Sequence, residues 1–189
     1  NYIDKEYTNA CIYVGGLSER YGTDLLIETF KILNTNNLKY KLILVCRLNE
    51  YIDYRNEFRK YDWVEVHHVS GNELIRLYNK ATIALMPLKH TKYNDLAVSI
   101  KLFEYMSYGL PIVATSNKAM KEIILDAKCG IITNDDSQSY SNAIINIFEN
   151  KADLEALSQN ALNSLKNNHT WENRALKVSY DLLNKKDNK

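Results

Sequence analysis

Residues that interrupt or cross-link a chain are scarce in this sequence, which holds two prolines, six glycines and three cysteines among 189 residues. The cysteines, Cys11, Cys46 and Cys129, are odd in number, far apart and set in apolar runs. A zinc site needs cysteines that lie closer together. We therefore expect buried, reduced thiols in a cytoplasmic protein, and no metal site.

The sequence also lacks an excess of charge and a long apolar run. Its 24 basic and 23 acidic residues nearly cancel, which argues against non-specific recruitment of nucleic acid or anionic lipid, so any phosphate must be bound locally. No stretch approaches ~20 apolar residues, and residues 1–10 lack the regions of a signal peptide. We expect a soluble protein. The early first strand and the charged tail at 184–189 would fit a chain cut from a longer protein.

Short apolar runs alternate with stretches of helical spacing, which predicts an α/β fold. Parallel strands need crossover connections, and runs such as LILV are apolar without alternation, as expected when helices cover both faces. We predict one domain over 1–189 with a Rossmann-like, doubly wound parallel sheet of about six strands and a C-terminal helical extension. The predicted strands are 10–14, 41–46, 63–69, 82–87, 111–115 and 130–133, and the predicted helices are 24–33, 51–60, 72–80, 98–108, 118–127, 137–149, 152–165 and 171–184.

The loop after the first predicted strand is one candidate site, because ligands of open α/β sheets bind beyond the carboxyl ends of the strands. This loop (GGLSERYG) begins with Gly15 and Gly16, which let backbone approach a ligand closely. A helix with Asp24 as its predicted N-cap follows and would offer free amides to an anion. A plain tight turn explains the same residues.

The predicted helix 98–108, which Gly109 closes, is the second candidate. Lys101 and Glu104 fall on one stripe of this helix. The Glu104 carboxylate could accept hydrogen bonds from sugar hydroxyls. The Lys101 ammonium and the first amides of the helix could bind phosphate. An ion pair on a solvated helix surface is the alternative. For His67 and His68 a structural role is the better interpretation. No spacing of Ser, His, Asp or Cys residues in the sequence indicates a catalytic triad or a metal cluster.

Taken in order, these segments resemble the C-terminal domain of family 4, or group 1, retaining glycosyltransferases of the GT-B type. IYVGGLSERYGTDLLIETF is similar to the family's first strand, glycine loop and helix, and SGNELIRLYNKATIALMPL to the segment before its donor site. SIKLFEYMSYGLPIVAT carries the most specific similarity, KEIILDAKCGIIT continues it, and TWENRALKVSYDLL resembles the terminal helix. That helix tends in the family to pack back on the N-terminal domain.

The resemblance implies roles for individual residues. Glu104 would bind the ribose hydroxyls of a nucleotide, and Lys101 would stabilise the leaving diphosphate. The other implied donor contacts are Ser99 and Ile100 at the diphosphate, Gly15 and Gly16 beneath it, and Arg47, His68 and Val69 at the base.

Some family residues are replaced. Where the family commonly has an arginine and a lysine that touch phosphate, this chain has Gly16 and Tyr21, and neighbouring Arg20 is the candidate substitute. The family's first glutamate would fall at Leu96, with Asp95 adjacent as a candidate sugar contact. This chain therefore lacks some of the family residues that would neutralise the phosphate charge and recognise the sugar.

The implied activity is transfer of a hexosyl-type group from a UDP-, GDP- or ADP-sugar to an acceptor hydroxyl with retention and without a metal or other cofactor. The acceptor, a glycan, a lipid or another molecule, would bind mainly to an absent N-terminal domain, which could also touch a membrane. We expect no nucleic-acid partner. The chain alone should bind donor but transfer little. The alternatives are a non-catalytic ligand-binding or assembly module, and a nucleotide-sugar epimerase or hydrolase of the same fold.

Overall fold

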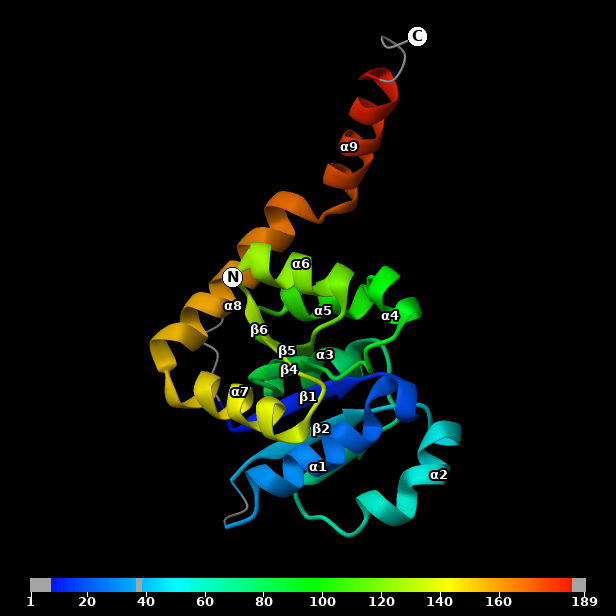
Figure 1. Cartoon of the computed structure of the whole chain (residues 1–189), viewed down its shortest axis with the longest axis vertical. Helices are drawn as coiled ribbons and strands as arrows, with labels where there is room; N and C mark the ends of the chain where they lie inside the picture. The colour runs from blue at the N-terminus through cyan, green and yellow to red at the C-terminus, as the bar shows by residue number, and fades with distance from the viewer. Residues whose placement is uncertain (1–7, 37–38, 185–189) are drawn as a thin grey trace.

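A single parallel sheet organises the chain, as the computed structural model of residues 8–36 and 39–184 shows (Figure 1). Residues 1–7, 37–38 and 185–189, with most of the charged tail, lie outside the described residues. The strands run in the order β3-β2-β1-β4-β5-β6, so the doubly wound prediction is confirmed. Their bounds are β1 Ala10–Val14, β2 Lys41–Val45, β3 Val64–His67, β4 Ile83–Met86, β5 Ile112–Thr115 and β6 Gly130–Thr133.

Helices cover both faces of this sheet (Figure 1). Those that pack on one face through large buried side chains are α1 and α7, and those on the other are α3, α5 and α6. The helix bounds are α1 Thr23–Leu33, α2 Leu48–Phe58, α3 Asn72–Lys80, α4 Lys92–Leu96, α5 Ile100–Ser107, α6 Lys118–Ala127, α7 Ser137–Glu149, α8 Lys151–Asn168 and α9 Trp171–Asn184, with a 3-10 turn, η1, at Glu19–Tyr21.

The central strand β1 shows why its residues are apolar without alternation. Cys11 and Tyr13 belong to the core under α1 and α7, whereas Ile12 and Val14 belong to the core under α3, α5 and α6. Successive side chains of a strand point to opposite faces, so a strand covered on both faces needs an apolar residue at every position. Cys11, Cys46 and Cys129 are all buried free cysteines, as predicted from their apolar surroundings.

Two buried tyrosines tie helices to strand backbone at the sheet's center. Tyr140 of α7 donates its hydroxyl proton to Val113 O at 2.6 Å and accepts from Met86 N at 3.0 Å. Tyr105 of α5 accepts from Val14 N at 3.0 Å. These contacts occur where β1 and β4 end, so they fix the strand ends from which the site is built.

The helix boundaries differ from the predicted ones where local capping decides them. Gly22, and not Asp24, is the N-cap of α1, and Asp24 lies in the first helical turn. The five-residue helix α4 was missed, because a segment this short offers no periodicity to detect. The predicted end of α5 is confirmed, since Gly109 (φ 58°) lets Leu110 N donate to Tyr105 O at 3.1 Å, which closes a Schellman motif.

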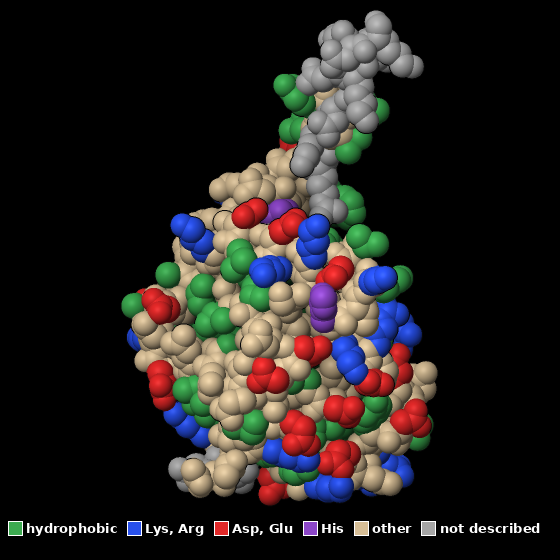
Figure 2. All heavy atoms as spheres, in the orientation of Figure 1, with side chains coloured by type: hydrophobic (Ala, Val, Ile, Leu, Met, Phe, Trp, Pro, Cys, Tyr) green, Lys and Arg blue, Asp and Glu red, His purple; other side chains and the backbone are tan. Residues whose placement is uncertain are grey.

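The last helices leave the body of the molecule. Helix α8 packs against α5, α6 and α7, and α9 then projects outward (Figure 1). Several large apolar side chains of α9 are exposed, including Leu176, Tyr180 and Leu183, and Figure 2 shows hydrophobic atoms along it. Within the residues that the structure describes, we find no helix with the length and apolarity that a membrane crossing requires.

Candidate functional site

A pocket of about 760 Å³ opens at the carboxyl ends of β1, β2 and β4. The strand order reverses between β1 and β4, and crevices at such reversals are where open α/β sheets bind ligands. The pocket is therefore in the place that the sequence predicted. Its lining is Tyr13, Val14, Gly15, Gly16, Tyr21, Val45, Cys46, Arg47, Leu48, Glu50, His68, Val69, Ser70, Leu85, Met86, Leu88, Ser99, Lys101 and Tyr105.

The two glycines of the pocket lining lie in close contact with tyrosine side chains. A Cβ atom on Gly15 would lie 2.5 Å from the hydroxyl oxygen of Tyr13, and one on Gly16 would lie 2.7 Å from the ring of Tyr21. Tyr13 also donates its hydroxyl proton to Gly16 O at 2.7 Å. The absence of a side chain at Gly15 and Gly16 thus lets these two tyrosines pack against the loop, in addition to leaving room for a ligand.

Most amides of the glycine loop are already used within the protein. Gly15 N donates to Val45 O at 2.9 Å, Leu17 N to the Glu50 carboxylate at 3.1 Å and Ser18 N to the Thr23 hydroxyl at 2.9 Å. Within the described chain, the Gly16 amide has no such partner. Of the loop residues that line the pocket, Gly15, Gly16 and Tyr21, Gly16 is therefore the one whose amide could bind an anion without rearrangement.

The start of α5 forms a second wall. Ser99 is its N-cap but makes no side-chain capping bond, and the first amides of a helix have no acceptor inside the helix. Half-buried Lys101 and buried Tyr105 line the same wall. Burial raises the pKa of Tyr105 above its ordinary value, so its hydroxyl stays protonated and can donate while it accepts from Val14 N.

The ends of β2 and β3 close the pocket on the other side. His68 hydrogen-bonds through Nδ1 to Cys46 O at 2.9 Å, and its ring lies 5.3 Å from that of Tyr51. Arg47 is largely exposed at the rim, with its side chain 82% accessible. Burial, and then the nearby Glu50 carboxylate, raises the pKa of the Cys46 thiol to about 11, so this thiol is no nucleophile at neutral pH.

Comparison with known proteins decides the family. The model of the family described as glycosyl transferases group 1 matches residues 8–150, which span the sheet, the pocket and α7. The chain belongs to the group 1 glycosyl transferases. Its fold is that of the C-terminal domain of a GT-B glycosyltransferase.

The relatives are distant and longer. An uncharacterized glycosyltransferase of Methanocaldococcus jannaschii is 23% identical over 167 residues, which are 85% of this chain and 41% of that protein. An uncharacterized 41.2 kDa protein from the cps region of Klebsiella pneumoniae is 24% identical over 151 residues, 79% of this chain and 38% of that protein. The chain thus spans about two fifths of these curated relatives.

A solved structure shows the same fold with a bound nucleotide. The HepE protein of Anabaena in complex with UDP matches with a TM-score of 0.73 and 17% identity, over 92% of this chain and 49% of that one. At this identity the match establishes the fold alone.

Among the group 1 residues predicted from sequence, Gly15, Gly16, Ser99, Lys101, Arg47, His68 and Val69 line the pocket. Glu104 does not belong to this lining. It is exposed on α5 and accepts a hydrogen bond from the Tyr78 hydroxyl at 3.1 Å. Burial, followed by charge from its neighbours, raises the pKa of Tyr78. Within the described residues Lys101 and Glu104 form no ion pair, although both lie on α5.

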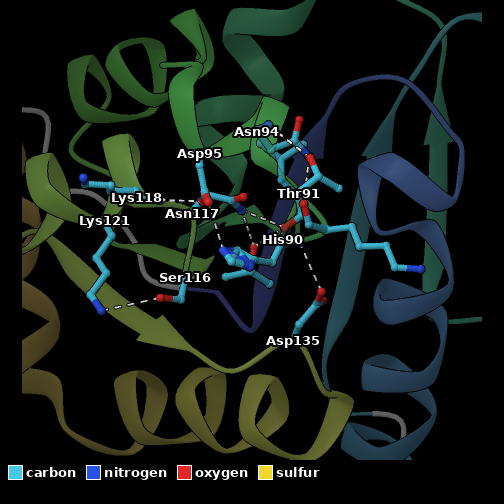
Figure 3. Close-up of polar contacts among 12 residues, drawn as sticks. His90, Thr91, Asn94, Asp95, Ser116, Asn117, Lys118, Lys121 and Asp135 are labelled. Atoms are coloured by element: carbon cyan, nitrogen blue, oxygen red, sulfur yellow. Dashed lines mark hydrogen bonds and ion pairs between the residues drawn. The ribbon is translucent and has the colours of Figure 1, made fainter.

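Three other predicted residues lie apart from the lining. Ile100 is 71% exposed at the first position of α5. Arg20 packs its guanidinium 4.3 Å from the Tyr93 ring centre and donates to Asn94 Oδ1 at 3.4 Å. Asp95 accepts from Lys118 N at 3.1 Å and pairs with His90 Nε2 at 3.1 Å (Figure 3). The Asp95 carboxylate therefore caps α6, a role that its position beside Leu96 did not reveal.

The structure adds pocket residues that the sequence did not indicate. Tyr13, Tyr21, Glu50 and Tyr105 all line it. Tyr105 follows Glu104 in the donor-site motif and could have been suspected from it. Glu50 lies in the first turn of α2 with no motif around it, so only its contact with the distant glycine loop identifies it.

Proposed function

We propose that this chain binds a nucleotide diphosphate sugar and, within a longer enzyme, transfers the hexosyl group to an acceptor hydroxyl with retention of configuration. The observation that carries the proposal is the pocket at the reversal point between β1 and β4, walled by the glycine loop and the start of α5. Membership of the group 1 family supports it. The UDP bound by the HepE protein of the same fold is consistent with such a donor.

The contacts suggest how the donor would lie. The diphosphate would rest between the free Gly16 amide and the uncapped start of α5, where Ser99, Ile100 and Lys101 present amides and an ammonium. The base would lie toward Arg47, His68 and Val69 on the other wall. This arrangement gives the diphosphate and the base neighbours of suitable chemistry.

Catalysis would depend on charge stabilisation as the glycosidic bond to the diphosphate breaks. Lys101 and the first amides of α5 would supply it without a metal ion. Arg20 would have to leave Tyr93 and Asn94 to assist. Among the described residues no group of three His, Cys, Asp or Glu side chains could hold a metal ion, and the absence of a metal requirement remains part of the proposal.

The acceptor would bind largely outside this chain. The chain spans about two fifths of its curated relatives, and α9 leaves apolar side chains such as Leu176 and Tyr180 exposed. We propose that an N-terminal domain covers this helix and completes the cleft, and that the whole enzyme is cytoplasmic. This chain by itself should then bind the donor but transfer little.

Titration of the chain with UDP, GDP and ADP, followed by amide chemical shifts, tests the proposal. Shifts clustered at 15–17 and 99–101 are expected for at least one nucleotide. No response at millimolar concentrations of all three would contradict it. A radiolabelled transfer assay is the second arm, in which full turnover by this chain alone would contradict the role proposed for the missing domain.

Glu104→Ala should weaken binding of the responding nucleotide by about 1–3 kcal/mol, because a carboxylate that accepts from ribose hydroxyls makes charge-assisted hydrogen bonds. Tyr78→Phe is the matched control, since it removes the present partner of Glu104 and leaves the carboxylate in place. Isothermal titration calorimetry measures both. Equal affinities of Glu104→Ala and the unmodified chain would exclude a ribose contact by this residue.

A further inference from the structure

Glu50 is an unexpected residue for a pocket that takes a diphosphate. Among the described residues it is the only carboxylate in the lining, and it lies there with Arg47 and Lys101 as the cations. Its side chain is 26% exposed, so its charge is only partly screened by water. A negative charge at this depth opposes a second negative charge brought in by a ligand.

The carboxylate makes two kinds of contact. Glu50 Oε2 accepts from Leu17 N at 3.1 Å and lies 3.2 Å from the point where a Cβ of Gly16 would be. Glu50 Oε1 lies 3.9 Å from Arg47 Nη1, but this guanidinium is mostly in solvent and compensates the carboxylate weakly. Glu50 therefore links α2 to the glycine loop, and its negative charge in the pocket remains largely uncompensated.

This contact also determines which loop amides remain available. A backbone N–H that points at an anion site is the usual phosphate ligand of such loops. Here the Leu17 amide is bound by Glu50, whereas the neighbouring Gly16 amide has no partner within the described residues. Glu50 thus anchors the loop next to Gly16 and places its own charge in the same pocket lining.

We propose that Glu50 is a positioning residue of the donor site that fixes the glycine loop through the Leu17 amide and whose charge limits the affinity for nucleoside diphosphates. The proposal rests on the proposed function, since it concerns the diphosphate end of the same pocket. Limited affinity favours release of the nucleoside diphosphate that remains after transfer.

The charge is tested with Glu50→Gln, which retains an acceptor for Leu17 N and removes the negative charge. We expect UDP, or whichever of GDP and ADP binds, to bind at least threefold more tightly to this variant at low salt, with a smaller gain at high salt. The corresponding nucleoside without phosphate should bind both proteins equally. Asp53→Asn is the matched control, because Asp53 is exposed on the same helix and outside the pocket lining.

The loop role is tested with Glu50→Ala, in which the Leu17 amide loses its acceptor. Faster hydrogen exchange of this amide, relative to the chain and to Asp53→Asn, is the expected result. An unchanged exchange rate of the Leu17 amide would overturn the loop role of Glu50. This measurement requires no ligand.

The outcomes separate the two proposals. Nucleotide binding by the unmodified chain combined with equal or weaker binding by Glu50→Gln would overturn the charge role and leave the proposed function standing. Absence of binding to the unmodified chain would overturn the proposed function and the charge role together.

Discussion

Replacing Gly22 by alanine is expected to lower the free energy of unfolding by about 2–5 kcal/mol. Gly22 has φ 72°, and a Cβ atom there would lie 1.8 Å from the carbonyl oxygen of Pro87. The backbone of an alanine would be strained, and the segment after β4 would also have to move away. Urea unfolding followed by circular dichroism measures the loss.

Gly71→Ala isolates backbone strain from a steric clash, because nothing lies within 4 Å of its added Cβ. Gly71 has φ 59° and ψ −132°, a conformation that costs a residue other than glycine about 1–3 kcal/mol. A loss of only about 1–2 kcal/mol in Gly22→Ala, the cost of its left-handed conformation alone, would mean that Gly22 and Pro87 are not in close contact. The contact matters for the site, because Leu88, next to Pro87, lines the pocket.

Replacing Lys101 by glutamate is expected to weaken nucleoside diphosphate binding at least a hundredfold, or about 3 kcal/mol. A hydrogen bond to a charged group contributes about 1.5–3 kcal/mol, and the new carboxylate would repel the diphosphate in addition. Lys101 is the half-buried cation of the pocket lining, beside the uncapped start of α5. Calorimetric titration with the nucleotide that binds best measures the effect.

Lys121→Glu provides the control for charge reversal as such. Lys121 is exposed on α6 and lies outside the pocket lining, so its reversal should change affinity little, and less still at high salt. If both variants bind nucleotide equally well, Lys101 makes no contact with the diphosphate. A preserved amide spectrum of Lys101→Glu would show that the loss is not caused by unfolding.

The sequence predicted the fold class well because buried elements show local patterns of apolar residues and of helix-ending glycines. Each residue of β1 is apolar since both faces of the sheet are covered, and Gly109 marks the end of α5 since its positive φ closes the helix. Helix α4 shows no such pattern because it is short. The N-cap of α1 was assigned to Asp24 in error, because the true N-cap, Gly22, has no side chain that could form a capping bond and mark the start of the helix.

The candidate site was predicted in part. The glycine loop and Lys101 belong to two segments that resemble the family, and the structure brings both to one pocket. Arg20 and Asp95 were chosen by adjacency to family positions, and in the structure they contact Asn94 and Lys118. Adjacency along a loop does not fix the direction of a side chain, because the loop backbone has no regular period.

The sequence by itself therefore determined the strand and helix pattern, the doubly wound sheet and the family motif at 99–109, all of which depend on residues close together in the chain. Only the tertiary structure decided that Glu50 contacts the glycine loop, that Tyr13 and Tyr21 pack against Gly15 and Gly16, and that Asp95 caps α6. Those contacts depend on where separate loops meet at the edge of the sheet. The spacing of residues along the chain does not predict such contacts between loops, because the packing of the whole core determines them.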